Sequence, residues 1–255
     1  MRIISFSADG IQSAADSGFY QWLQDEDADF ICVQDLRCSE YDLQADTYFP
    51  EGYNAYFFDS VEGKNNGVAI YCKELPKAIM TGLGFTDFDM EGRYIQADYS
   101  NISVGCILVP GGGEGGSEEA ARKAEFLSML QGHLGKIRNK RREFIICGGW
   151  NLAHTAADVQ DTEQNSTRSG FLAEERQWMD ETLALDYVDA FREINSDSDE
   201  FSYWPDGNRD SNGWRTDYHL VSQGLKYAIE YGAIYTGQKF STHAPVIMDY
   251  DLEPV

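Results

Sequence analysis

Short apolar runs, separated by polar and glycine-containing stretches, recur along the whole chain. Runs that are rich in β-branched and aromatic side chains are typical of buried strands. The pattern predicts strands at Arg2–Ser7, Phe30–Gln34, Asn54–Phe58, Gly67–Tyr71, Ile95–Tyr99, Ile102–Val109, Phe144–Cys147, Thr216–Leu220, Tyr227–Tyr235 and Pro245–Tyr250.

Helices are predicted at Phe19–Asp25, Ser117–Gly135 and Ala173–Leu185. The second of these places its large apolar residues on one face, as an amphipathic helix does. Ser117 is suited to cap its amino terminus, and two glutamates follow in the first turn, where the helix dipole favours negative charge.

No change in composition and no proline-rich linker divides the chain, so residues 1–255 are predicted to form a single domain. Strands and helices alternate in two similar halves that meet near a glycine-rich loop at Gly111. The expected fold class is α/β, with two packed mixed β-sheets flanked by helices. We expect no membrane span and no leader, because no stretch is long and apolar enough for either.

The cysteines indicate a reducing compartment. The chain has five, and none of their spacings is typical of a metal site. Four lie in predicted strands, at Cys32, Cys72, Cys106 and Cys147. We therefore expect reduced core cysteines in a cytoplasmic protein.

The net charge is −23, from 43 acidic and 20 basic residues. Phosphate contacts dominate nucleic-acid affinity, so the overall field predicts a poor autonomous binder of DNA or RNA, although a local cleft can still be positive. An adaptation to a saline habitat explains the same acidity without reference to any partner.

Basic residues gather just before the Phe144 strand, at Lys136, Arg138, Lys140, Arg141 and Arg142. Cations in the last turn of a helix interact favourably with its dipole, and this alone accounts for the run. The run is also a candidate contact for an anionic partner such as RNA.

Polar residues stand where several predicted strands end, at Ser7 and Asp9, Gln34 and Asp35, Asn151, Asp217, and Thr242 and His243. These residues would converge at one rim if the sheets pack face to face. Ligands of open α/β sheets bind at such an edge. A carboxylate would be useful there, but the turn after Cys147 has Gly149 two residues before Asn151.

The sequence around these strand ends resembles the exonuclease III and AP-endonuclease family. The segments that carry the resemblance are Ser5–Ile11, Ile31–Asp35, Arg215–Asp217 and Thr242–Pro245. Phe171–Asp180 is similar to a structural helix of that family, and the resemblance runs essentially end to end. It implies a four-layer α/β sandwich. It also implies hydrolysis of phosphodiesters with Mg²⁺, the activity of the family's active members.

The resemblance also implies a damaged site. Asn151, Asp217 and His243 match the family, and Asp9 matches a position that is acidic in some members. Asp35 replaces a longer glutamate that is the primary metal ligand. Family side chains are lost at four positions: an asparagine at Ser7, a tyrosine at Leu108, and aspartates at Gly149 and Thr242. Losing acid–base and charge-stabilising groups removes much of a rate enhancement. We therefore expect no catalysis, no bound metal and no cofactor.

The chain is also similar to a non-catalytic branch of that family, the catabolite repression control (Crc) regulators. The segments that carry this similarity are Gln34–Asp35, Gly82–Phe85, Arg93–Asp98 and Phe240–Asp251. This similarity implies a post-transcriptional regulator that represses translation together with the RNA chaperone Hfq on A-rich messenger sites. The implied partner is the Hfq–RNA complex rather than free RNA, which suits a strongly acidic chain.

Two other functions remain open from the sequence. One is a weak Mg²⁺-dependent phosphodiesterase of the exonuclease III and AP-endonuclease type, using Asp9, Asp35, Asn151, Asp217 and His243. The other is a phosphatase-like hydrolase of small phosphoesters, which only the range of the wider superfamily indicates.

Overall fold

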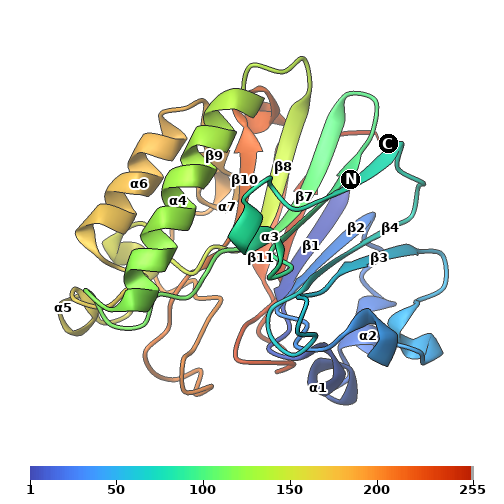
Figure 1. The fold of residues 1–255 in the computed structure, drawn as a ribbon, viewed down its shortest axis with the longest axis horizontal. Coiled ribbons are helices and arrows are strands. Elements are labelled where there is room, and N and C mark those ends of the chain that lie inside the picture. The colour runs from blue at the N-terminus through green and yellow to red at the C-terminus, as the bar shows by residue number, and fades with distance from the viewer. Residues whose placement is uncertain (254–255) are drawn as a thin grey trace.

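Two six-stranded sheets pack face to face in the computed structural model, which describes residues 1–253 (Figure 1). The first sheet has the order β11-β12-β1-β2-β4-β3 and the second the order β5-β6-β7-β8-β10-β9. The strands are β1 (Arg2–Ser7), β2 (Phe30–Gln34), β3 (Asn54–Phe58), β4 (Val68–Cys72), β5 (Ala78–Thr81), β6 (Tyr94–Asp98), β7 (Ile102–Leu108), β8 (Glu143–Gly149), β9 (Tyr187–Asp189), β10 (Asp217–Ser222), β11 (Ile229–Ile234) and β12 (Val246–Tyr250).

Helices cover the outer faces of both sheets, so the predicted four-layer α/β sandwich is confirmed. The helices α4 and α6 lie on the second sheet, and α1 and α2 lie on the first (Figure 1). No helix within residues 1–253 is both long and apolar enough to cross a membrane. The helices are α1 (Ile11–Asp16), α2 (Phe19–Leu23), α3 (Thr86–Asp89), α4 (Glu118–Ile137), α5 (Thr162–Asn165), α6 (Ala173–Leu183) and α7 (Ala190–Ile194), with 3-10 turns η1 (Glu40–Asp42), η2 (Asp46–Tyr48), η3 (Ala156–Asp158) and η4 (Gln223–Ala228).

The apolar core has three main layers, one between the sheets and one under each helical layer. Every cysteine is buried and unpaired, and the four predicted to lie in strands do so, which confirms the expectation of core thiols. Ser117 caps α4 as predicted, since its hydroxyl accepts a hydrogen bond of 3.1 Å from the backbone of Ala120.

Each sheet contains one parallel pair, β1 with β2 and β7 with β8. The two pairs face each other across the core, since β1 packs on β8 and β2 on β7. Asp9 and Asp35, which follow β1 and β2, line one cavity together with Leu108 and Asn151, at and after the ends of β7 and β8, so the carboxyl ends of the four central strands lie at the same end of the sandwich. This is the rim at which the sequence predicts a site.

The predicted strands are all present, with small differences at their ends. The prediction for Gly149 was wrong, because this residue was predicted to lie in a turn and is instead the last residue of β8. It pairs with Leu108 on one side and with Asp217 on the other. The chain crosses from the first sheet to the second after β4 and returns to the first sheet after β10. The first sheet therefore contains both the first strand, β1, and the last, β12. The division into two halves at Gly111 stays a prediction.

Candidate active site

A cavity of about 580 Å³ opens at the carboxyl ends of the central strands. Ser7, Gly149 and Asp217 lie beside or beneath it, at the ends of β1 and β8 and the start of β10. The predicted convergence of strand-end residues is thus confirmed. The cavity is lined by Asp9, Asp35, Arg37, Asn65, Asn66, Arg93, Leu108, Val109, Gly111, Asn151, Tyr203, Pro205, Thr242 and His243.

A carboxylate–imidazole pair is the chemical centre of this rim. His243 Nδ1 lies 2.8 Å from Asp217 Oδ2. A carboxylate only accepts hydrogen bonds, so Nδ1 carries the proton. Nε2, which has no hydrogen-bond partner within residues 1–253, is the nitrogen left to meet a ligand. Asp217 is buried and is also held by the hydroxyl of Ser202 at 2.6 Å and that of Ser7 at 3.1 Å.

Tyr203 fixes the plane of the imidazole, because the two rings stack with centroids 4.4 Å apart. Burial raises the pKa of the Tyr203 phenol, and the charges of Asp9 and Asp217 raise it further. The hydroxyl therefore stays protonated at neutral pH. Ser202 and Tyr203 are adjacent in sequence, so one loop holds both members of the pair, the carboxylate through Ser202 and the ring through Tyr203.

Gly149 is a strand residue rather than part of a turn, and its missing side chain would lie beside the Asp217–His243 pair. A Cβ at Gly149 would stand 2.9 Å from Ser7 Oγ, 3.4 Å from Leu108 Cδ1 and 3.7 Å from Asp217 Oδ1. Ser7, Leu108 and Gly149, at which the resemblance implies lost side chains, are therefore mutual neighbours. The hydroxyl of Ser7 partly fills the volume that a side chain at Gly149 would need.

Asp9 and Asp35 lie side by side because the pairing of β1 with β2 continues beyond the strand ends. The backbone N–H of Ala8 donates to Gln34 O at 2.8 Å, and that of Gly10 donates to Asp35 O at 2.9 Å. Thr242 Oγ1 donates to Asp9 Oδ2 at 3.1 Å. Thr242, where the resemblance implies a lost aspartate, thus supports one of the two carboxylates.

Both carboxylates share a cation that the sequence prediction missed. The Nη2 atom of Arg37 contacts Asp9 Oδ1 and lies 2.8 Å from Asp35 Oδ2. Partial burial lowers the pKa of Arg37, but the charges of Asp35 and Asp9 more than offset this, so the pKa lies above its usual value. The guanidinium is therefore a permanent charge of this site.

The carboxylates of Asp9 and Asp35 can be tested for their fit to Mg²⁺, which the fold family implies. No group of three or more His, Cys, Asp or Glu side chains within residues 1–253 is arranged to hold a metal ion. Mg²⁺ is commonly bound by one or two carboxylates and takes its other ligands from water and substrate. Asp9 and Asp35 already converge on one cation, so the pair fits Mg²⁺ once Arg37 has moved away.

Asn151 connects the loops at the cavity mouth. Its Nδ2 donates to Val109 O at 2.6 Å, and its own carbonyl accepts a hydrogen bond of 2.6 Å from Lys123 Nζ. Lys123 is buried in α4 and pairs with Glu175 of α6 at 2.7 Å. The segment predicted to be a structural helix, Phe171–Asp180, thus anchors the backbone of Asn151 through this ion pair.

A second hollow of about 350 Å³ adjoins the cavity and shares Gly111, Asn151, Tyr203 and Pro205 with it. Trp214 and Arg168 also line this hollow. The sequence prediction missed this hollow, because its aromatic residues lie in loops where no periodic pattern indicates burial.

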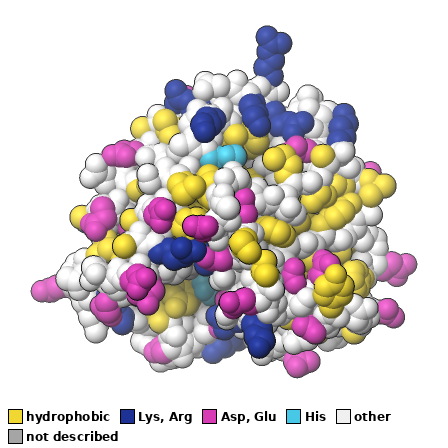
Figure 2. All heavy atoms as spheres, in the orientation of Figure 1, with side chains coloured by type: hydrophobic (Ala, Val, Ile, Leu, Met, Phe, Trp, Pro, Cys, Tyr) yellow, Lys and Arg dark blue, Asp and Glu magenta, His cyan; other side chains and the backbone are white. Residues whose placement is uncertain are grey.

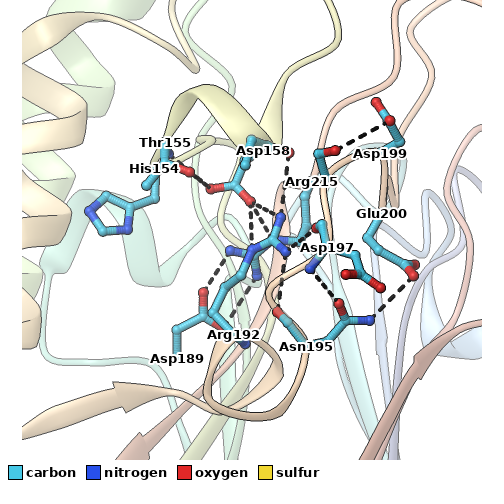
Figure 3. A network of polar contacts seen from close by, with 12 residues as sticks. His154, Thr155, Asp158, Asp189, Arg192, Asn195, Asp197, Asp199, Glu200 and Arg215 are labelled. Carbon is cyan, nitrogen blue, oxygen red and sulfur yellow. Dashed lines mark hydrogen bonds and ion pairs between the residues drawn. The ribbon is translucent and has the colours of Figure 1, made fainter.

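A buried ion network supports the strand that carries Asp217 (Figure 3). The guanidinium of Arg215, two residues before Asp217, lies between Asp158 at 2.7 Å and Asp189 at 2.6 Å. Arg192 contacts the same oxygen of Asp158 at 2.6 Å. Burial alone would raise the pKa of Asp158, but the two arginines reverse this and hold the pKa well below its usual range.

Asp158→Asn is expected to lower the free energy of unfolding by about 3 kcal/mol at pH 7, because it leaves buried arginine charge uncompensated. The folded-state pKa is depressed, so the stabilisation is present above the unfolded pKa of about 4 and is lost as the pH falls below it. Urea unfolding of both proteins at pH 7, 5 and 3 checks this. An unchanged difference between the two proteins at pH 3 would contradict it.

The predicted basic run lies at the other end of the sandwich. It surrounds the end of α4 and the start of β8, whereas the cavity lies past the end of β8, roughly 20 Å away along a strand of this length. Figure 2 shows Lys and Arg side chains gathered at this upper end of the molecule. Arg142 pairs with Asp98 and Arg138 with Asp186, while the other three side chains, Lys136, Lys140 and Arg141, are exposed and form no ion pair within residues 1–253.

Known proteins match nearly the whole chain in sequence. The model of the endonuclease/exonuclease/phosphatase family matches residues 10–232. The chain belongs to this family. An exodeoxyribonuclease of Bacillus subtilis (strain 168) is 31% identical over 253 residues, which are 96% of this chain and 98% of that protein. A DNA-(apurinic or apyrimidinic site) endonuclease of Dictyostelium discoideum is 30% identical over 258 residues, which are 99% of this chain and 71% of that protein.

Two solved structures of similar shape add to the identification of the fold. An AP endonuclease from Archaeoglobus fulgidus has a TM-score of 0.89 and 24% identity, over 99% of this chain and all of that one. The 3′-5′ exonuclease NExo from Neisseria meningitidis has the same TM-score and 22% identity, also over 99% of this chain and all of that one. At this identity the likeness concerns the fold alone.

These comparisons correct one expectation. The side chains lost at the rim led to the prediction that the chain is not an enzyme. That prediction is contradicted, because members of the family that match nearly the whole chain are named as an exodeoxyribonuclease and an AP-site endonuclease. The carboxylate–imidazole pair that such an activity would use is also in place.

Proposed function

We propose that the chain is a weak Mg²⁺-dependent phosphodiesterase that acts on nucleic acid, in the manner of exonucleases and AP endonucleases. The observation that carries this proposal is the Asp217–His243 pair, which is held in one orientation at the floor of an open cavity. The names of the matching relatives support the choice of substrate class.

The polar residues of the site have separate roles in the proposed reaction. In its protonated form His243 donates a hydrogen bond from Nε2 to a phosphoryl oxygen, while Asp217 stabilises the positive charge of the ring. Asp9 and Asp35 would hold Mg²⁺, which neutralises the charge that develops on the phosphoryl group. The activity is weak because Gly149 provides no carboxylate to orient or deprotonate the attacking water. Leu108 likewise offers no hydroxyl.

Cleavage assays on a panel of substrates test this function. The purified protein is incubated with a duplex that contains an abasic site, with a blunt duplex and with single-stranded RNA, each in Mg²⁺, Mn²⁺ or EDTA. We expect slow cleavage of at least one DNA substrate with a divalent ion and none in EDTA. The absence of cleavage in every combination would contradict the proposal. Release of phosphate from small phosphoesters only would favour a phosphatase instead.

A second candidate function is regulation of translation, and the exposed cations Lys136, Lys140 and Arg141 favour it. They form no ion pair within residues 1–253, in a chain that is otherwise strongly acidic. We propose that they contribute a contact to a cytoplasmic complex of Hfq with A-rich RNA, away from the cavity. Such a complex can present both basic protein and anionic RNA surfaces, so the acidic body and the basic end would each find an opposite charge.

A pull-down with purified Hfq, with and without A-rich RNA, tests the second function. Changing Lys136, Lys140 and Arg141 together to Gln should weaken the ternary complex by about tenfold or more, since each charge contributes to phosphate attraction. Lys64→Gln, on the loop between β3 and β4, is the control for the loss of one exposed charge outside this surface. Retention of the complex by the triple variant would exclude this surface.

A further inference from the structure

Arg37 holds the two carboxylates of the candidate metal site in a closed ion-paired cluster. Its guanidinium contacts Asp9 and lies 2.8 Å from Asp35, on the same side of the cavity. The backbone sets this arrangement, because the N–H of Arg37 donates to Asn66 O at 2.9 Å while the carbonyl of Asp35 accepts from Gly10. The loops after β1 and β2 are thus linked both through their backbones and through this guanidinium.

We propose that Arg37 is an internal competitor of the divalent ion: its guanidinium occupies the place between Asp9 and Asp35, and a metal binds there only by displacing it. The inference rests on the proposed function, since it concerns the cation of the same site. Arg37 thereby sets the metal affinity of the chain.

The balance of charge explains why the competition is effective. With Arg37 in place, the two carboxylates and the guanidinium have a net charge of −1. Without it, an entering dication would meet a net charge of −2. A guanidinium a few ångströms from a divalent ion lowers its affinity by about tenfold or more even in water-like surroundings. The ion pairs must also break before the metal can reach both carboxylates.

The side chain of Arg37 is able to make this movement. It is about half exposed, with a side-chain exposure of 48%, whereas the carboxylates of Asp9 and Asp35 are 27% and 20% exposed. The other cavity arginine, Arg93, is much less free, with a side-chain exposure of 11%, and it pairs with Glu91. Arg37 is therefore the cation that can leave the cluster at little structural cost.

Direct binding of Mn²⁺, measured by electron paramagnetic resonance without any substrate, tests this inference. Arg37→Gln is expected to bind one Mn²⁺ about tenfold more tightly than the unmodified protein at 150 mM KCl, a salt concentration that screens the acidic surface. Arg37→Lys should give a smaller gain, because an ammonium keeps the charge but loses the planar fork.

Two control variants separate local competition from a general change in charge. Arg168→Gln removes the same charge from the adjoining hollow, where Arg168 lies near Glu114, and should leave Mn²⁺ affinity within twofold. Adding Asp35→Asn to Arg37→Gln should abolish the gain. Equal affinity in Arg37→Gln and the unmodified protein, or an equal gain in Arg168→Gln, would overturn the inference. Because no cleavage is measured, this result is independent of whether the chain proves to be a nuclease.

Discussion

His243→Ala is expected to lower the rate of nucleic-acid cleavage by about 10²–10⁴-fold, the usual contribution of a positioned acid–base group. The imidazole is the only cavity side chain within residues 1–253 that pairs with a buried carboxylate and also keeps a free ring nitrogen. Its removal also leaves the Asp217 carboxylate without its partner. Initial rates on the best substrate of the panel measure the loss.

His154→Ala is the matched control for this prediction. His154 also pairs with an aspartate, Asp180 at 2.7 Å, but it lies outside the cavity. Its loss should change the rate less than twofold. A rate for His243→Ala equal to that of the unmodified protein would show that the cleavage does not arise at this site.

Gly149→Asp is expected to raise the cleavage rate by about 10²-fold, at the lower end of what a general base contributes. Gly149 is a strand residue whose φ is not in the left-handed region, so the backbone itself accepts a side chain. The new Cβ would stand 3.7 Å from Asp217 Oδ1 and 2.9 Å from Ser7 Oγ, so the Ser7 hydroxyl must rotate away and release its hydrogen bond to Asp217. The carboxylate would therefore enter the cavity beside the His243–Asp217 pair.

Gly149→Asn provides the comparison, because an amide has nearly the same shape but cannot act as a base. We expect no increase in its rate. Thermal unfolding of both variants shows whether the repulsion between a new carboxylate and Asp217 destabilises the fold. If Gly149→Asp remains folded and is no faster than Gly149→Asn, then the weakness of the site does not come from this position.

The fold was largely predictable from the sequence because buried strands are read from apolar runs. β2, β4 and β8 are almost wholly apolar and fully or nearly fully buried, and all three were predicted. The edge strand β5 was missed because most of its residues are exposed, so that burial imposes no pattern. The three-residue strand β9 is too short to show a pattern.

The Asp217–His243 pair was predictable because both residues lie at the ends of recognisable strands. Arg37 and Ser202 were missed for a physical reason. They lie in loops, where position depends on backbone hydrogen bonds between distant segments, such as those that link Gly10 with Asp35. Arg37 had one available signal, since it follows Asp35 by two residues and is a cation among strand-end carboxylates.

The prediction that the chain is not an enzyme rested on the family side chains lost at the rim, and it was made without sight of what holds the remaining ones. Catalytic groups act as a unit, so the combined cost of those losses is not the sum of the separate costs and could not be derived from the residue types alone. The buried ion network of Arg215 and the ring of Tyr203 still hold the remaining pair in a defined orientation. A site that keeps this support can retain weak activity.

Chemical rescue tests most directly whether the His243 imidazole performs the reaction. His243→Gly should be nearly inactive on the abasic duplex, and added imidazole should restore cleavage in proportion to its concentration, since a free ring can occupy the vacated space above Asp217. The unmodified protein should not respond. Restoration confined to the variant is the predicted result. Residual cleavage by His243→Gly that added imidazole leaves unchanged would contradict the account.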